Sequence, residues 1–153
     1  MTYDFHGSWD AKTGINAPMY DAAAPDFSVD GCVKNWVDAG APREKLNLGL
    51  PFYGRSYLGS GITGKDQEFD GSGDGVTWAD DEGTPQYFNI VDKISSFTSE
   101  RDEESKTQIA YNGDGYLSYD DELAICDKAE YALNEGLNGF IIWEISGDLM
   151  EDL

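Results

Sequence analysis

The chain is poor in basic residues, histidine, cysteine and long apolar runs. Its 10 lysines and arginines stand against 30 acidic residues, which gives a formal net charge of −20. Charge of this sign repels phosphate backbones and anionic lipid surfaces, so we expect neither nucleic acid nor a membrane as a partner. The charge is typical of a highly soluble protein or of a salty or extracellular setting, and it identifies no substrate.

No stretch of the chain approaches the ~20 consecutive apolar residues that a membrane span needs. The first residues also lack a basic segment followed by an apolar run, so we expect no targeting signal in this chain. Cys32 and Cys126 are too few for a disulfide framework and have no CxxC partner or histidine cluster for zinc. Both fall on predicted helix core faces, which favours buried free thiols, with one long-range disulfide as the alternative.

What is present is an alternation of strands and helices. Residues 1–4 are predicted to end a β-strand. After a loop, Ser28 can cap a helix that Gly40 and Pro42 end. The apolar residues of this helix recur with helical spacing: Val29, Cys32, Val33, Trp36 and Val37. The next segment alternates with period two, as a half-buried strand does: Leu46, Leu48 and Leu50.

Residues 56–119 differ in character, because Gly and Asp-rich turns alternate there with aromatic residues. This composition predicts an inserted small α+β subdomain. One helix is expected within it, with Thr84 as its N-cap and Pro85 at its first position. Its predicted buried stripe is Tyr87, Ile90, Val91, Ile94 and Phe97. The charged stretch SERDEESK is interpreted as a solvated loop or a helix end.

A last helix and a last strand are predicted after residue 119. Asp120 or Asp121 can cap the helix, and Gly136 ends it. Its predicted buried face contains Ile125, Ala129, Ala132 and Leu133, and GFIIWEIS is predicted to be a buried strand. The order is typical of an α/β protein with parallel strands and right-handed crossovers.

Three such strands are too few for a closed (β/α)₈ barrel, which takes about 250 residues. We therefore expect the last third of a larger fold, a partial barrel that carries an inserted subdomain. Its expected parts are residues 1–55 with two barrel strands and the helix between them, residues 56–119 with the insertion, and residues 120–153 with the last helix and strand.

Candidate functional residues follow the ends of the three predicted strands, where the active site of such a barrel lies. Tyr3 and Asp4 follow the first strand, Tyr53 and Arg55 the second, and Trp143 ends the third. Each residue alone has an ordinary structural explanation as a turn, a surface charge or a core side chain. Together, aromatic rings and a few polar groups at one barrel mouth indicate a carbohydrate site, because a flat ring covers the apolar face of a sugar.

Three motifs, MTYDFHGSWD, LNLGLPFYGRSY and YDDELAICDKAEYALNEGLNGFIIWE, resemble in their order the C-terminal part of a glycoside hydrolase family 18 chitinase. The resemblance covers essentially the whole chain, and it implies barrel strands six, seven and eight with the family's α+β insertion. It also implies a secreted, extracellular parent protein that needs no cofactor or metal and acts on chitin or chitooligosaccharides.

The resemblance further implies a role for single residues. In this family the substrate's N-acetyl oxygen attacks the anomeric carbon while one protein acid protonates the leaving oxygen. Tyr3 would hydrogen-bond the acetamido group and Asp4 would bind the same sugar. The remaining implied substrate-binding residues are Trp143 as the floor of the site, Met1 beside it, Tyr53 and Arg55 along the sugar chain, Trp9 on the leaving-group side, and Glu82 on the cleft wall.

The family's catalytic glutamate ends a D-G-x-D-x-D-x-E strand, and no such segment occurs in this chain. The acidic strings ADDEG, RDEES and YDDELA follow turn or polar residues, so we interpret them as surface or cap carboxylates. Glu144 adjoins Trp143, but alternation along a strand points it the other way. We therefore expect a truncated chain whose acid, together with the N-terminal part of its barrel, lies in sequence before Met1.

Two weaker signals accompany these motifs. DGSGDGVTWADD places acidic and small residues near the offsets of a calcium-binding loop, but it lacks flanking helices and the usual final Glu: Asp70, Ser72, Asp74, Gly75 and Asp81. His6 has no nucleophile or second histidine in a recognisable pattern, which favours a local hydrogen bond over proton transfer.

Three functions remain open from the sequence. The first is a chitin-degrading hydrolase of which this chain supplies half the cleft. The second is a chitinase-like lectin that binds chitooligosaccharides without cutting them. The third is a fragment without activity, whose open strand edges would favour aggregation.

Overall fold

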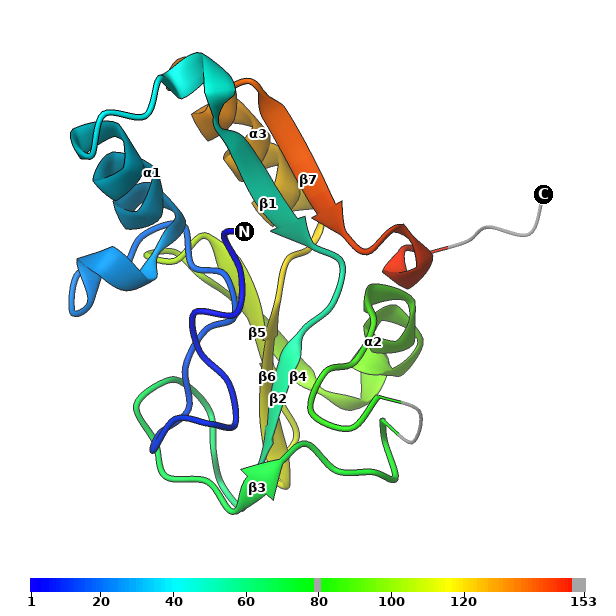
Figure 1. Ribbon diagram of the computed structural model, residues 1–153. Helices are drawn as coiled ribbons and strands as arrows, with labels where there is room; N and C mark the ends of the chain where they lie inside the picture. The colour runs from blue at the N-terminus through cyan, green and yellow to red at the C-terminus, as the bar shows by residue number, and fades with distance from the viewer. Residues whose placement is uncertain (79–80, 150–153) are drawn as a thin grey trace.

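The computed structural model describes residues 1–78 and 81–149 (Figure 1). Its α-helices are α1 (Val29–Asp38), α2 (Tyr87–Lys93) and α3 (Glu122–Asn134), and short 3-10 helices cover Pro25–Phe27, Arg43–Lys45, Ile94–Ser96 and Ile145–Gly147. The strands are β1 (Asn47–Pro51), β2 (Arg55–Leu58), β3 (Gly71–Ser72), β4 (Thr98–Asp102), β5 (Thr107–Tyr111), β6 (Gly115–Tyr119) and β7 (Gly139–Trp143).

The strands form two separate sheets. β1 and β7 make a parallel pair whose register runs from Asn47 opposite Gly139 to Pro51 opposite Trp143. The other five strands make an antiparallel sheet in the order β3-β2-β6-β5-β4. Figure 1 shows the parallel pair at one end of the molecule, with α3 behind it and α1 beside it, and the antiparallel sheet at the other end with α2 on one side.

Helix α1 packs against β1 largely as its sequence predicts. Ser28 is the N-cap, and its hydroxyl accepts a hydrogen bond from the Gly31 amide at 3.1 Å. One core cluster joins this helix to β1 and α3: Met19, Val29, Val33, Leu48, Leu50 and Tyr131. Trp36 departs from the prediction, since it is 60% exposed. It lines two open cavities, one shared with Phe5 and Cys32 and the other with Met1 and Ile141.

Helix α3 begins and ends as predicted, and its buried face overlaps the predicted one in part, since Ala132 is buried and Ile125 packs against the core. Asp121 is its N-cap and accepts from the Ala124 amide at 2.8 Å, and Gly136 follows the helix with a φ of +68°. Leu133, predicted in the core, is 80% exposed. The buried residues are Ala124, Lys128, Tyr131 and Ala132. The buried face therefore also includes Lys128, whose ammonium group donates to the Ala17 carbonyl and pairs with Asp120.

The strand predictions at both ends of the chain need correction. Residues 1–4 form no regular strand; Thr2 docks beside β1 through its side chain, which donates to the Gly49 carbonyl and accepts from the Gly49 amide, both at 2.8 Å. β7 forms as predicted but is not buried. Its residues from Phe140 to Trp143 are exposed, because β1 is its only strand partner within the described residues.

The antiparallel sheet also differs from the sequence prediction in two places. Thr84 and Pro85 do not begin α2; Gln86 is its N-cap, because the Pro85 carbonyl accepts from the Gly54 amide and Gln86 bridges to Tyr53. SERDEESK is not a solvated loop or helix end, since its first residues form β4 and the rest turn into β5. β4 is an edge strand, where charged side chains reach solvent and discourage pairing with another chain.

The two cysteines are free thiols, as predicted, but they are not buried. Cys32 is half-buried and Cys126 is exposed. Their helices turn both side chains away from the centre of the core, which apolar spacing alone did not reveal. Within residues 1–78 and 81–149, no helix is long and apolar enough to cross a membrane.

Candidate functional site

Asp4 is the centre of a polar cluster between the two sheets. One of its carboxylate oxygens, Oδ1, accepts three hydrogen bonds: from the Tyr53 hydroxyl at 2.7 Å, from Arg55 Nε at 3.0 Å and from Arg55 Nη2 at 2.7 Å. Bonds between a guanidinium and a carboxylate are charge-assisted and therefore strong. The Asp4 side chain stays 40% exposed, so it can also accept a donor from a ligand.

The local fold explains why these residues meet. β1 ends at Pro51 and β2 begins at Arg55, so Tyr53 lies where the chain passes from the parallel pair to the antiparallel sheet. The opening segment docks on β1 through Thr2, and the hydrogen bond from the Tyr53 hydroxyl holds Asp4 at the same place. The backbone of Asp4 has a φ of +61°, a left-handed conformation that Asp and Asn adopt more readily than most residues.

Aromatic rings surround the Asp4 cluster. Tyr3 meets Tyr53 edge to face, with ring centres 6.0 Å apart. The Arg55 guanidinium lies 4.7 Å from the centre of the Trp9 ring and 5.5 Å from that of Tyr53, within cation–π range. Trp9 folds back over Gly7, where a Cβ atom would come within 2.4 Å of the indole ring. The Trp9 ring remains 57% exposed.

Burial and charge keep both phenols protonated. Burial raises the pKa of Tyr53, and the hydrogen bond to Asp4 raises it further. Burial, followed by the charge of Asp4, also raises the pKa of Tyr3. The Tyr3 hydroxyl is buried and has no hydrogen-bond partner among the described residues. The Tyr3 hydroxyl therefore carries a proton that no described residue accepts.

The structure brings Tyr3, Asp4, Trp9, Tyr53 and Arg55 together, and it places the other predicted site residues around or apart from them. Trp143 ends the neighbouring strand with its ring 56% exposed, and its carbonyl accepts from the Phe52 amide at 2.8 Å. The peptide bond from Trp143 to Glu144 is cis.

Two predicted residues do not contact the Asp4 cluster. Met1 is 81% exposed at the start of the segment that runs beside β1. Glu82 lies beside Ser72, whose hydroxyl is 3.5 Å from its Oε1. Neither side chain shares a hydrogen bond with Asp4, Tyr53 or Arg55 in the described part of the chain.

Sequence reasoning missed two residues that hold the Asp4 cluster. Thr84 Oγ1 accepts from Arg55 Nη1 at 2.9 Å. Asn16 uses its side-chain amide to bind both the Asp4 amide, at 2.9 Å, and the Tyr53 carbonyl, at 3.2 Å. No periodic pattern marks a buried polar residue in a loop, and only the Gly, Asn and Pro content of residues 14–18 sets this segment apart.

Most acidic strings have the structural roles expected of them. In YDDELA, Asp121 caps α3 and Glu122 accepts from the Tyr87 hydroxyl at 2.8 Å. In RDEES, Asp102 accepts from the Ser105 amide, and Glu103 pairs with Lys106. Asp120 differs, since it is buried beside Lys128. The first two residues of ADDEG, at positions 79 and 80, lie outside the described residues.

The weaker signals also have local explanations. His6 Nδ1 lies 3.1 Å from Asp10 Oδ2, the local hydrogen bond that was predicted. Asp74, in the calcium-like loop, accepts from the Val76 and Thr77 amides and so stabilises a turn. Within the described ranges, no group of three or more His, Cys, Asp or Glu side chains is arranged to hold a metal ion.

Comparison with known proteins agrees with this architecture. The family description Glycosyl hydrolases family 18 matches residues 1–148. Chitinase A1 of Niallia circulans is 34% identical over an alignment of 163 residues in length, gaps included. The alignment covers 97% of this chain and 23% of that protein. An immunomodulatory active chitinase from Trichuris suis is similar in structure, with a TM-score of 0.89, 31% identity, and coverage of 97% of this chain and 42% of the other.

A third similar structure is that of human YKL-39, described as a pseudo-chitinase with retained chitooligosaccharide binding properties. It has a TM-score of 0.89, 28% identity, and coverage of 97% of this chain and 43% of the other. The chain thus spans less than half the length of each of these relatives. Because the family match covers nearly all 153 residues, the chain belongs to the glycosyl hydrolases of family 18.

Proposed function

We propose that this chain forms part of the substrate cleft of a chitinase, a hydrolase of β-1,4-linked N-acetylglucosamine polymers. The observation that carries the proposal is the Asp4–Tyr53–Arg55 cluster with the exposed Trp9 ring against Arg55 and a second exposed indole, Trp143, at the end of β7. Hydroxyl and amide groups of a sugar need fixed donors and acceptors, and its apolar faces need flat rings. Family membership supports a glycan as the ligand.

In this proposal the chain is a part of a (β/α)₈ barrel with an inserted subdomain at residues 56–119. The parallel β1–β7 pair with α1 and α3 around it supports the barrel part, and the five-stranded antiparallel sheet between β1 and α3 supports the insertion. The exposed apolar face of β7 supports further strands as its neighbours. The acidic charge suits an extracellular enzyme.

The proposed chemistry is substrate-assisted hydrolysis with retention of configuration. The Tyr3 hydroxyl donates to the acetamido oxygen that attacks the anomeric carbon, and Asp4 accepts from the same sugar. Oδ1 of Asp4 accepts three hydrogen bonds, so in this proposal Asp4 serves as an acceptor rather than as the proton donor. The proton donor is then a glutamate outside these 153 residues, and Trp143 forms the apolar floor under the sugar.

A chitooligosaccharide-binding lectin is the second candidate. It is favoured by the equal structural similarity to a described pseudo-chitinase and to an active chitinase, each with a TM-score of 0.89. Both candidates share the same cleft, so they differ only in whether a proton donor faces it.

The test is to measure binding and hydrolysis of N-acetylglucosamine tetramer by the full-length protein and by two variants. Trp143→Ala should weaken binding by about 1–3 kcal/mol, since it removes an aromatic platform. Tyr3→Phe should lower kcat more than it raises KM, because its hydrogen bond strengthens as the acetamido oxygen attacks. Phe88→Ala, an exposed aromatic residue on α2, is the matched control.

Each result separates the candidates. Binding with hydrolysis supports the chitinase, and binding without hydrolysis supports the lectin. If the protein binds no tetramer, or if Trp143→Ala binds as tightly as Phe88→Ala, the site assignment is wrong.

A further inference from the structure

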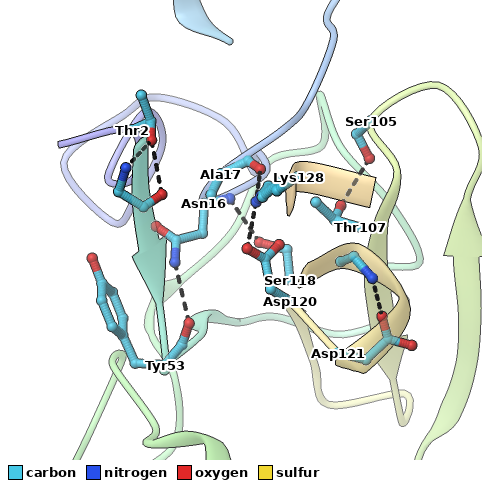
Figure 2. A network of polar contacts seen from close by, with 12 residues as sticks. Thr2, Asn16, Ala17, Tyr53, Ser105, Thr107, Ser118, Asp120, Asp121 and Lys128 are labelled. Atoms are coloured by element: carbon cyan, nitrogen blue, oxygen red, sulfur yellow. Dashed lines mark hydrogen bonds and ion pairs between the residues drawn. The ribbon is translucent and has the colours of Figure 1, made fainter. Parts of the chain in front are cut away.

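Asn16 is a buried residue that joins the opening segment to the connection between β1 and β2 and to β6. Its side chain is 1% exposed and bonds to the Asp4 amide and the Tyr53 carbonyl. Its own backbone also takes part, since its carbonyl accepts from the Phe5 amide at 3.0 Å and its amide donates to Ser118 Oγ at 2.9 Å. Figure 2 shows Asn16 between Tyr53 and the residues at the end of β6.

The residue after Asn16 is held from the opposite side by Lys128. The Lys128 ammonium group donates to the Ala17 carbonyl at 2.7 Å, and it also pairs with Asp120 Oδ2 (Figure 2). Lys128 comes from the middle of α3, whereas Asp120 directly follows β6. A contact across 111 residues of sequence thus fixes the loop at Asn16 and Ala17 against α3.

This ion pair is costly to bury, which argues for a role besides stability. The side chains of Lys128 and Asp120 are 0% and 1% exposed. Burial lowers the pKa of Lys128 and raises that of Asp120, so the desolvation of each group opposes its charged form. Asp120 Oδ1 has no hydrogen-bond partner among the described residues. Apolar residues of similar volume often stabilise a fold as well as such a pair does.

The pair does something that apolar residues cannot do. The ammonium group has three hydrogens that point in different directions, so one lysine can bind a carbonyl of the loop and a carboxylate of the sheet at once. The Asn16 side-chain amide, held in place by this loop, then fixes the Asp4 backbone and Tyr53 through its two hydrogen bonds. Neither Asn16 nor Lys128 belongs to the proposed set of ligand-contacting residues.

We propose that Asn16 and Lys128 are positioning residues for the Asp4–Tyr53–Arg55 cluster. They set where the Asp4 carboxylate and the Tyr53 hydroxyl lie, and they do so through hydrogen bonds rather than by touching the sugar. The inference deepens the proposed function and rests on it for the meaning of the cluster, although the geometry can be tested without any ligand.

The first test compares Lys128→Met with Thr107→Val in the full-length protein. Thr107 is a matched control, because it is 1% exposed and its hydroxyl lies 2.8 Å from Ser105 Oγ, with no bond to Asn16 (Figure 2). The ligand-free readout is the NMR signal of the Arg55 Nε–H group, which donates to Asp4. Lys128→Met should shift or broaden this signal, and Thr107→Val should leave it as in the wild type.

The second readout is catalytic or binding performance. Lys128→Met should lower kcat, or affinity in a lectin, by about ten- to hundredfold through misplacement of the Asp4 cluster. Its effect on KM should be smaller, and the activity of Thr107→Val should stay near that of the wild type. A protein that binds no chitooligosaccharide refutes the proposed function, whereas the Arg55 signal still decides the positioning role.

Two further measurements keep the test decisive if Lys128→Met does not fold. The double variant Lys128→Met/Asp120→Asn removes both charges and should still perturb the Arg55 signal, since the Ala17 contact is gone. In the unmodified protein, the Asp4 amide hydrogen should exchange with solvent as slowly as the amides of α3. An unchanged Arg55 signal in a folded variant, or exchange at the rate of an exposed loop, overturns the proposal.

Discussion

At the scale of single residues, the backbone of Asp4 matters as much as its carboxylate. Its left-handed conformation turns the chain so that Oδ1 meets Tyr53 and Arg55. A left-handed backbone costs an ordinary residue roughly 1–2 kcal/mol, and Asn or Asp pays less because a short polar side chain can bond locally. Asp4 therefore combines a conformational and an electrostatic requirement at one position.

This combination predicts different effects for two substitutions. Asp4→Asn should keep the backbone turn and an oxygen acceptor for Tyr53, whereas Asp4→Ala loses both. We expect Asp4→Ala to lower the free energy of unfolding by about 1–3 kcal/mol more than Asp4→Asn, as measured by urea denaturation of the full-length protein. Asp92→Ala, an exposed carboxylate on α2, is the control. Equal destabilisation by the two Asp4 variants would contradict both the backbone preference and the acceptor role.

Residues with a sequence signal were predictable, and residues held only by tertiary contacts were not. Helical spacing and cap chemistry located Ser28 and Asp121, and strand-end motifs located Tyr53 and Arg55. The burial of Lys128 was not predicted, because apolar spacing marks only apolar residues as buried. A lysine that is buried through an ion pair with Asp120 does not fit that pattern. Asn16 was missed because its four bonding partners come from distant parts of the chain.

At the scale of elements, β7 is a strand whose apolar side chains are largely exposed to solvent. Phe140, Ile141 and Ile142 are 43%, 44% and 40% exposed, although their sequence predicts a buried strand. The sequence pattern correctly indicated which residues are apolar, but it did not show how many neighbours the strand would have. An exposed apolar strand with an open edge is a template for pairing with other chains.

This exposure predicts how the 153 residues behave when expressed alone. We expect them to self-associate, and we expect Ile141→Lys to reduce the association by placing a charge on the open strand. Sedimentation velocity at several concentrations measures the effect, with Leu133→Lys on the exposed side of α3 as the control. A concentration-independent monomer for the unmodified chain would contradict the prediction.

At the scale of the whole molecule, buried phenols couple folding to alkaline pH. Burial raises the pKa of Tyr53, Tyr57 and Tyr116 above the usual value of 10.0. The folded state therefore retains these protons at pH values where the unfolded state releases them. Their contribution to stability is fully present below pH 10.0 and falls as the pH rises toward the higher pKa values of the folded state.

The expected result is alkaline unfolding in step with tyrosine ionisation. Tyrosinate absorbance of the full-length protein should rise cooperatively above pH 10.0, at the same pH at which the far-ultraviolet circular dichroism signal is lost. Tyr116→Phe should move this transition to higher pH, provided that it folds normally, because it removes one group whose ionisation drives unfolding. Complete tyrosine ionisation with an intact dichroism spectrum would refute the coupling.

The pairing of Arg55 with Ser118 has a consequence for how this fold could be rebuilt. These two residues lie opposite one another where β2 enters and β6 leaves the antiparallel sheet. Paired positions on antiparallel strands are only about 4.5–5.5 Å apart. The whole segment between them is therefore a cassette with adjoining ends, and a tight hairpin turn has the reach to take its place. An exchange at this junction would remove Thr84 and its hydrogen bond to Arg55, whereas the bonds from Arg55 to Asp4 and from Asn16 to Ser118 lie outside the exchanged segment.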